Sequence, residues 1–150
     1  MSAIYLDTSA LLKRYVQEQG SDELEAWIVT SSVTGTVKIT YAEIAAALAK
    51  LKRMQWLNAD DAHVAWENFS SEYPFFVHIE VTEPVIDLAA DLAWEHGLRG
   101  YDAVHLAAAL LWKTQAGEDI QMVTFDKQLW EVAKIVGLKR LPEDIEKYRQ

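Results

Sequence analysis

The stretch Ala3-Ile4-Tyr5-Leu6-Asp7-Thr8-Ser9 decides both the fold and where its chemistry lies. Four largely apolar residues predict a buried strand, which stops at an acid followed by two hydroxyl side chains. A helical pattern of apolar residues begins at once. A carboxylate held where a buried strand passes into a helix lies at the edge of an α/β sheet at which ligands bind. The stretch therefore predicts a strand, a turn and a helix, with Asp7 at a candidate site.

Three more acids, Glu43, Asp102 and Asp126, stand at the start of other predicted helices. Glu43 and Asp126 closely follow predicted strands, as Asp7 does. Because the strand-to-helix turns of a parallel sheet lie at one edge, these three acids are expected to be neighbours. Asp102 precedes a run that is apolar nearly all round, which is typical of a buried helix. It must reach the same edge from the start of that helix.

Strand and helix patterns alternate along the chain. This alternation predicts an α/β fold, an α/β/α sandwich whose mainly parallel central sheet of four to five strands has helices on both faces. No internal repeat or Pro/Gly-rich linker appears, so residues 1–150 are expected to form a single domain. Predicted strands cover 3–6, 37–39, 75–79 and 122–125, and predicted helices cover 11–16, 21 onward with Ser21 as N-cap, 40–54, 58–73, 82–97, 102–111 and 127 onward.

Composition narrows the classes of protein. The chain has 150 residues, 51% of them hydrophobic, which is enough for one compact core. It contains no cysteine, so disulfides and thiolate metal sites are excluded, and its four histidines lack the spacing of zinc ligands. No apolar stretch approaches the roughly 20 residues that span a bilayer, and no signal-like segment precedes the first strand. We expect a soluble cytoplasmic protein without a membrane partner.

The formal net charge of −9 argues against tight, non-specific binding of nucleic acid. Several acids could belong to a metal site, however, and bound cations would offset them. Positive charge gathers at Lys50, Lys52 and Arg53, which end one predicted helix. These side chains either stabilise the C-terminus of that helix or form a local basic patch.

Each candidate acid also has a purely structural explanation. Glu43 completes a capping-box pattern with Thr40, Asp7 and Asp126 could be simple N-caps, and Asp102 could complement a helix dipole. Ser, Thr or Asn would serve as N-caps equally well, so the recurrence of acids weakens this explanation. Two carboxylates about 4 Å apart repel by roughly 4 kcal/mol at an effective dielectric constant near 20. A cluster of four is therefore expected to hold a divalent cation, and oxygen ligands favour Mg²⁺ or Mn²⁺.

The chain resembles the PIN-domain ribonucleases, especially the small VapC-type toxins of prokaryotic toxin–antitoxin pairs. Four motifs match in order and span nearly the whole chain, which is far more specific than a single Asp-Thr-Ser. No acidic position of the family pattern is missing. The motifs are Ile4-Tyr5-Leu6-Asp7-Thr8-Ser9-Ala10, Ile39-Thr40-Tyr41-Ala42-Glu43-Ile44, Leu98-Arg99-Gly100-Tyr101-Asp102-Ala103-Val104-His105-Leu106-Ala107 and Val123-Thr124-Phe125-Asp126-Lys127.

The resemblance implies a hydrolase: an endoribonuclease that uses Mg²⁺ or Mn²⁺ to cleave phosphodiester bonds in single-stranded regions of RNA. It implies that Asp7, Glu43, Asp102 and Asp126 are both the catalytic residues and the metal ligands. It also implies two protein partners, a cognate antitoxin and a second copy of the chain in a homodimer.

Other polar residues stand beside these acids. Thr8, Ser9 and Thr124 could hydrogen-bond the carboxylates or metal-bound water, or could simply cap helices. Arg99 could contact a substrate phosphate, pair with one of the acids, or be an ordinary surface arginine.

His105 lies three residues after Asp102, on about the same helix face. We expect a packed, hydrogen-bonded core histidine there rather than a proton donor. The six tryptophans are spread over separate predicted helices, which is typical of core and interface positions rather than of a base-stacking platform.

Two other functions are compatible with this fold class. A receiver-like phosphoryl-transfer domain would carry an acidic pair after its first strand, whereas Asp7 stands alone there, and Glu43 has no counterpart in that scheme. A non-catalytic module would use the same acids only to cap helices, or to bind a metal for stability or a protein partner. Cleavage of RNA that requires a metal and the acids would separate a nuclease from both.

Overall fold

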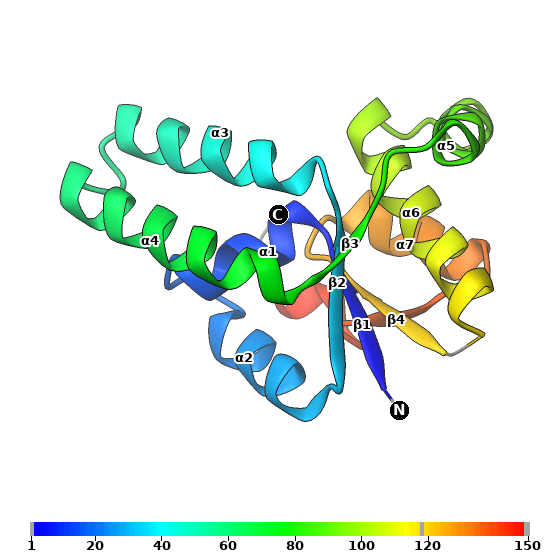
Figure 1. The fold of residues 1–150 in the computed structure, drawn as a ribbon, viewed down its shortest axis with the longest axis horizontal. Coiled ribbons are helices and arrows are strands. Elements are labelled where there is room, and N and C mark those ends of the chain that lie inside the picture. The colour runs from blue at the N-terminus through cyan, green and yellow to red at the C-terminus, as the bar shows by residue number, and fades with distance from the viewer. Residues whose placement is uncertain (1, 118, 149–150) are drawn as a thin grey trace.

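The computed structural model describes residues 2–117 and 119–148 and contains a five-stranded parallel sheet with strand order β3-β2-β1-β4-β5 (Figure 1). Strand β1 is central: Tyr5 lies opposite Gly35 of β2, and Leu6 lies opposite Val123 of β4. All four strand pairs are parallel, so the carboxyl ends of the strands share one edge. The strands are β1 (Ala3–Leu6), β2 (Val33–Val37), β3 (Val77–Ile79), β4 (Ile120–Val123) and β5 (Lys139–Leu141).

Helices cover both faces of the sheet, as the alternating pattern predicts (Figure 1). Side chains of β1 alternate between two hydrophobic clusters: Ala3 and Tyr5 pack with α5, α6 and α7, whereas Ile4 and Leu6 pack with α1 to α4. The helices are α1 (Thr8–Tyr15), α2 (Ser21–Thr30), α3 (Thr40–Arg53), α4 (Ala59–Glu72), α5 (Glu83–His96), α6 (Gly100–Ala116) and α7 (Lys127–Ile135), with short 3₁₀ helices η1 (Tyr73–Phe75) and η2 (Ile145–Lys147).

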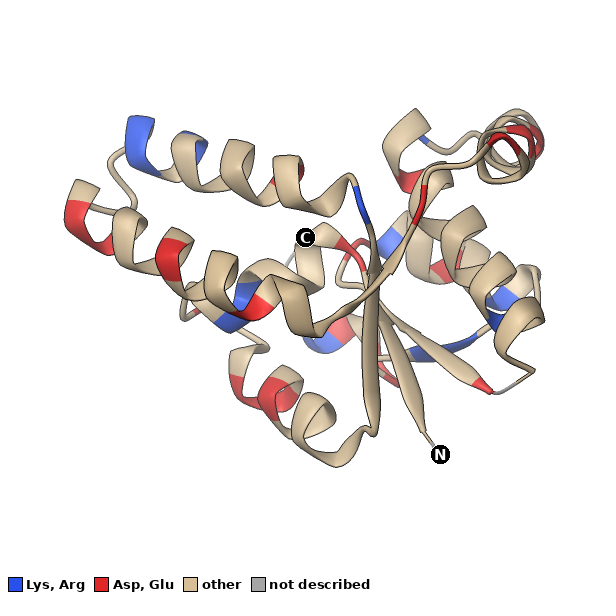
Figure 2. Cartoon of the chain, in the orientation of Figure 1, with Lys and Arg blue, Asp and Glu red and all other residues tan. Residues whose placement is uncertain are grey.

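Helices α3 and α4 form a hairpin that projects away from the sheet (Figure 1). The last turn of α3 contains three basic residues, Lys50, Lys52 and Arg53. Figure 2 shows blue segments at this free end of the hairpin. Asn58 caps α4 as expected, and its side chain accepts a hydrogen bond from the Asp61 amide at 2.7 Å. The hairpin places Glu43, in the first turn of α3, at the sheet and the basic residues at its far end.

Two predicted strands start at other residues than expected. The strand predicted over 37–39 is β2, Val33–Val37, and Lys38 lies in the turn before α3. The strand predicted over 75–79 begins only at Val77, because Pro74 and Phe75 belong to the 3₁₀ helix that ends the α3–α4 hairpin.

Two further boundaries and one whole strand differ from the sequence prediction. Strand β4 ends at Val123, so Thr124 and Phe125 connect it to α7. Strand β5 was not predicted. Gly20, with φ of 96°, is the N-cap of α2 in place of Ser21, whose hydroxyl accepts a hydrogen bond from the Glu18 amide instead.

Among the described residues, no helix is both long enough and apolar enough to cross a lipid bilayer.

Candidate metal centre

Asp7 lies at the junction of β1 and α1, at the carboxyl edge of the central strands. Its amide donates to the Val123 carbonyl, which keeps it beside the end of β4. Oδ1 accepts from the Ala10 amide at 2.9 Å and from Ser9 Oγ at 2.8 Å, and Oδ2 accepts from Thr124 Oγ1 at 2.5 Å. The side chain is buried, and this burial raises the pKa of Asp7 although the three donors act in the opposite direction. Asp7 is thus an N-cap whose second oxygen faces the turn between β4 and α7.

Asp126 is connected to Asp7 through a single hydroxyl group. Thr124 Oγ1 donates to Asp7 and accepts from the Asp126 amide at 3.1 Å. Asp126 Oδ1 caps α7 by accepting from the Leu129 amide at 2.9 Å, while Oδ2 lies 3.4 Å from Nη2 of Arg99. The N-cap explanation is therefore correct for one oxygen of Asp7 and of Asp126. The other oxygen of each contacts a side chain from elsewhere in the site, Thr124 for Asp7 and Arg99 for Asp126.

Asp102, in the first turn of α6, is joined to Asp126 by Arg99. Arg99 Nε donates to Asp102 Oδ2 at 2.9 Å while its Nη2 faces Asp126. The structure thus shows Arg99 paired with two of the candidate acids. The Arg99 side chain remains 76% exposed, so a ligand at this edge can still reach its guanidinium.

Glu43 is not part of a capping box, because tertiary contacts take both partners of that pattern. The hydroxyl of Thr40 bonds that of Thr36 at 2.7 Å, and α3 begins without a side-chain cap. Glu43 Oε1 instead accepts from Thr8 Oγ1 and from His105 Nε2, both at 2.7 Å. Partial burial opposes ionisation, but the bonds from His105 and Thr8 hold the pKa of Glu43 below its usual value.

The three hydroxyl groups expected near the acids all contact carboxylates. Ser9 Oγ donates to Asp7 and accepts from the Phe125 amide at 3.2 Å, so it joins α1 to the β4–α7 turn. Thr8 donates to Glu43 and Thr124 donates to Asp7. None of the three caps a helix with its side chain. Their contacts instead hold the carboxylates of Asp7 and Glu43 in place.

His105 is a buried, hydrogen-bonded core residue, as expected, but its contacts make it part of the site. Its Nε2 bonds Glu43, and its Nδ1 lies 2.7 Å from the hydroxyl of Tyr5. Sequence reasoning missed Tyr5, which it treated only as an apolar strand residue. The available signal was a phenol, which needs a polar partner when buried, two positions before Asp7 in a strand expected to be buried on both faces.

A divalent cation fits the chemistry of these donors. The four acids supply only oxygen ligands and come from four different elements to one edge of the sheet. Within residues 2–117 and 119–148, however, no three His, Asp or Glu side chains already form a compact group of metal ligands. Arg99 pairs with both Asp102 and Asp126. A cation at this edge would therefore compete with Arg99 for these two carboxylates.

The two roles of Asp126 predict different effects for two substitutions. Asp126→Asn keeps an oxygen that can cap α7, so the free energy of unfolding in EDTA should change by less than about 0.5 kcal/mol. Asp126→Ala removes the cap and should cost about 1 kcal/mol. Urea unfolding followed by circular dichroism measures both. A large destabilisation by Asp126→Asn would show that its charge, rather than its cap, holds this turn in place.

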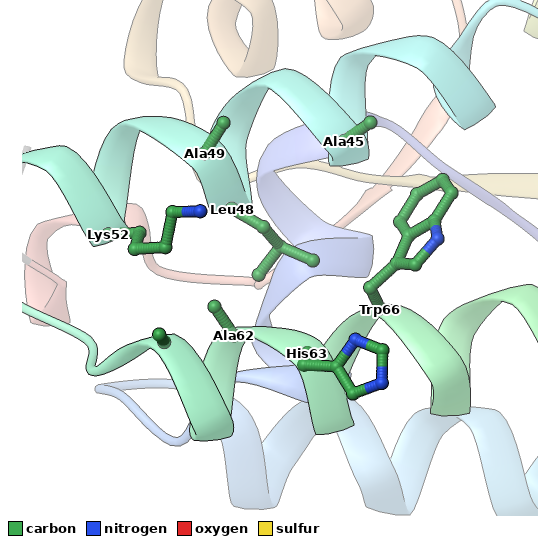
Figure 3. A pocket seen from close by; sticks show the side chains of 8 residues that line it. Ala45, Leu48, Ala49, Lys52, Ala62, His63 and Trp66 are labelled. Carbon is green, nitrogen blue, oxygen red and sulfur yellow. The ribbon is translucent and has the colours of Figure 1, made fainter.

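A separate groove lies between α3 and α4 (Figure 3). It encloses about 290 Å³, and its walls are mostly small apolar side chains with Trp66 at one end and His63 and Lys52 at its rim. None of the four acids lines it. The groove is therefore distinct from the carboxylate edge, although both involve α3.

Comparison with known proteins places this arrangement in a family. Residues 4–135 match the PIN domain family. The chain is 31% identical over 150 residues to Ribonuclease VapC45 of Mycobacterium tuberculosis (strain CDC 1551 / Oshkosh), a match that covers 97% of this chain and 99% of the relative.

Two solved structures share the fold. One is PAE2754 from Pyrobaculum aerophilum, with a TM-score of 0.65 and 22% identity over 97% of this chain and 88% of that one. The other is VapBC-5 from Mycobacterium tuberculosis, a member of the VapBC family of toxin–antitoxin systems, with a TM-score of 0.55 and 19% identity over 93% and 94% of the two chains. Because the family match spans most of the sequence and the similarity to VapC45 spans nearly all of it, this chain belongs to the PIN-domain family.

Proposed function

We propose that this PIN-domain protein is a divalent-metal-dependent endoribonuclease that hydrolyses phosphodiester bonds in single-stranded RNA and acts as the toxin of a toxin–antitoxin pair. The observation that carries the proposal is the chain of hydrogen bonds that links Asp7, Asp126 and Asp102 through Thr124 and Arg99. Glu43, which bonds Thr8 next to Asp7, supports it as the fourth acid. The ribonuclease name of VapC45, whose whole length this chain matches, supports the same activity.

In this proposal the four acids hold Mg²⁺ or Mn²⁺. When bound, such an ion stabilises negative charge on phosphate oxygens and makes water a better nucleophile. The protein itself positions the ligands: Ser9 and the Ala10 amide fix one oxygen of Asp7, and Thr124 fixes the other. Asp7 is buried, so its side chain has a fixed orientation. Asp102 and Asp126 lie nearer to solvent, where RNA can approach.

Arg99 has a second role in this proposal. A cation that takes over Asp102 and Asp126 would release the guanidinium, which is already exposed beside them. A guanidinium binds phosphate oxygens through two parallel N–H groups, which suits the backbone of an RNA substrate. Arg99 would then orient the phosphate next to the metal.

Metal removal tests the activity. We expect the purified protein to cleave labelled single-stranded RNA with Mg²⁺ or Mn²⁺, to stop when EDTA is added, and to resume when the metal is restored. An RNA of the same sequence annealed into a duplex serves as the matched control and should be cleaved more slowly. A protein that binds Mn²⁺ but leaves all RNA intact would favour a non-catalytic module, in which the acids cap helices and hold a structural ion.

Domain organisation and partners complete the proposal. Residues 1–150 act as one nuclease domain, supported by a single sheet whose strands run from Ala3 to Leu141. In this proposal the protein works in the cytoplasm. It binds an antitoxin, and the fold that it shares with VapBC-5 supports this partner. A homodimer is also proposed, and Trp94 on α5, whose side chain is 93% exposed, is a suitable interface residue.

A further inference from the structure

A buried polar chain lies behind Glu43. Tyr5 of β1 and His105 of α6 are 0% and 2% exposed, and the Tyr5 hydroxyl lies 2.7 Å from His105 Nδ1. On its other side, His105 Nε2 lies 2.7 Å from Glu43 Oε1. The chain therefore runs from the central strand, through the buried helix, to an acid of the metal centre.

Burying the polar ring of His105 costs folding free energy unless the ring is hydrogen-bonded. Its helix neighbours Leu106 and Ala107 are fully buried, and an apolar side chain could pack among them. A buried imidazole is tolerated only when hydrogen bonds replace those it made to water. Both ring nitrogens of His105 have such partners, Tyr5 on one side and Glu43 on the other. The polar connection is thus what distinguishes this histidine from an apolar residue.

The direction of the hydrogen bonds follows from the carboxylate. Glu43 Oε1 can only accept, so His105 Nε2 carries the hydrogen of the bond between them. In a neutral imidazole the other nitrogen, Nδ1, is then an acceptor, and the Tyr5 hydroxyl donates to it. The Tyr5 oxygen also accepts from the Val37 amide at 3.3 Å, which holds the hydroxyl in place. Tyr5 and Glu43 thus favour the same tautomer of His105.

Among the described residues, the side-chain hydrogen bonds to Glu43 all reach one of its two carboxylate oxygens. His105 and Thr8 both bond Oε1. We propose that Tyr5 and His105 are positioning residues, which hold Glu43 through Oε1 so that Oε2 is presented to a divalent cation. The proposal rests on the proposed function, because the cation is the one that the nuclease would use. Residues that orient a metal ligand in this way are typically worth 10- to 100-fold in metal affinity.

Binding of Mn²⁺ without RNA tests the proposal, followed through the loss of the free-ion electron paramagnetic resonance signal. Tyr5→Phe removes a single oxygen from the chain, and His105→Leu removes both ring contacts. Each should raise the Kd for Mn²⁺ by about 10- to 100-fold. His105→Gln retains an amide that can donate to Glu43 and should recover part of the affinity. In RNA cleavage, both disruptive variants should need more Mn²⁺ for half-maximal rate, and saturating Mn²⁺ should restore kcat.

His78→Leu is the matched control. The His78 ring stacks on Tyr73, and its Nε2 bonds the Tyr73 carbonyl at 2.7 Å. Like His105 it contacts a tyrosine residue, but unlike His105 it does not bond Glu43. This variant should bind Mn²⁺ like the parent even if its stability falls.

The outcomes separate this inference from the proposed function. If the parent binds Mn²⁺ and cleaves RNA while Tyr5→Phe and a folded His105→Leu bind Mn²⁺ equally well, the chain is only a core contact and the inference is wrong. Should His105→Leu fail to fold, the result for Tyr5→Phe decides. A parent that binds no Mn²⁺ and cleaves no RNA would overturn the proposed function together with this inference.

Discussion

Replacing Asp102 with Asn is expected to reduce RNA cleavage by at least about 100-fold while leaving the protein folded. Asparagine keeps the size and one oxygen of the side chain but removes the charge that would bind the cation. The structural loss should be small, because Asp102 pairs with the exposed Arg99 and such ion pairs contribute about 0–1 kcal/mol. A 100-fold loss of rate corresponds to about 2.7 kcal/mol of activation free energy, so the effect on catalysis should exceed that on stability.

Single-turnover cleavage of labelled RNA at saturating Mg²⁺ measures this effect, and urea unfolding measures stability on the same samples. Asp91→Asn is the matched control, since Asp91 lies on the exposed face of α5 and loses the same charge. The control should cleave RNA at the parental rate. Equal rates for the parent and a folded Asp102→Asn protein would remove Asp102 from the catalytic residues.

The first strand and the turn after it could be predicted from the sequence because the local sequence pattern and the tertiary structure favour the same elements there. An apolar run, an acid able to cap a helix and a helical pattern follow one another, and the structure contains β1, Asp7 as N-cap and α1 in that order. The same agreement holds for Thr82, which caps α5 ahead of Pro84, and for Gly97, which ends that helix. Local physics and the fold require the same residues at these positions.

The bounds of strand β2 could not be predicted because contacts with residues distant in the sequence determine which of its residues are suitable. Gly35 stands where a Cβ atom would lie 2.6 Å from the Trp112 ring of α6, so the strand requires glycine at a point where local propensity indicates a turn. Thr36 is buried because its hydroxyl donates to the Leu6 carbonyl. Strand β5 escaped prediction for another reason: it is a three-residue edge strand that begins with Lys139 and Arg140, and charged side chains are typical of sheet edges.

In the candidate site, too, the positions of the residues could be predicted but their contacts could not. Its acids were identifiable from their places at the ends of strands and the starts of helices. The structure links Asp7, Asp126 and Asp102 through Thr124 and Arg99, and Glu43 contacts Thr8 and His105 instead. The contacts between them were not identifiable. The local pattern of Thr40 and Glu43 indicates a capping box, yet a hydroxyl from β2 and two donors from α1 and α6 bind these side chains. Tertiary partners decide what a polar side chain contacts.

Replacing Phe69 with Ala is expected to destabilise the protein by about 3–5 kcal/mol. Phe69 lies on α4 and is fully buried, and its ring packs against aromatic rings of α1, α3, α4 and η1. The centroid distances range from 5.3 Å to 5.7 Å, and such pairs add about 0.5–1.5 kcal/mol beyond burial. The four partners are Tyr15, Tyr41, Trp66 and Tyr73.

This aromatic cluster attaches the α3–α4 hairpin to the rest of the fold, so its loss should also loosen Glu43 at the start of α3. Urea unfolding gives the free-energy change, and Phe75→Ala is the matched control because that ring is 87% exposed and follows α4 directly. The control should cost less than about 0.5 kcal/mol. If Phe69→Ala unfolds at the same urea concentration as Phe75→Ala, the hairpin is held by its backbone connections to the sheet rather than by packing. In that case the position of Glu43 would depend on its contacts with Thr8 and His105 alone.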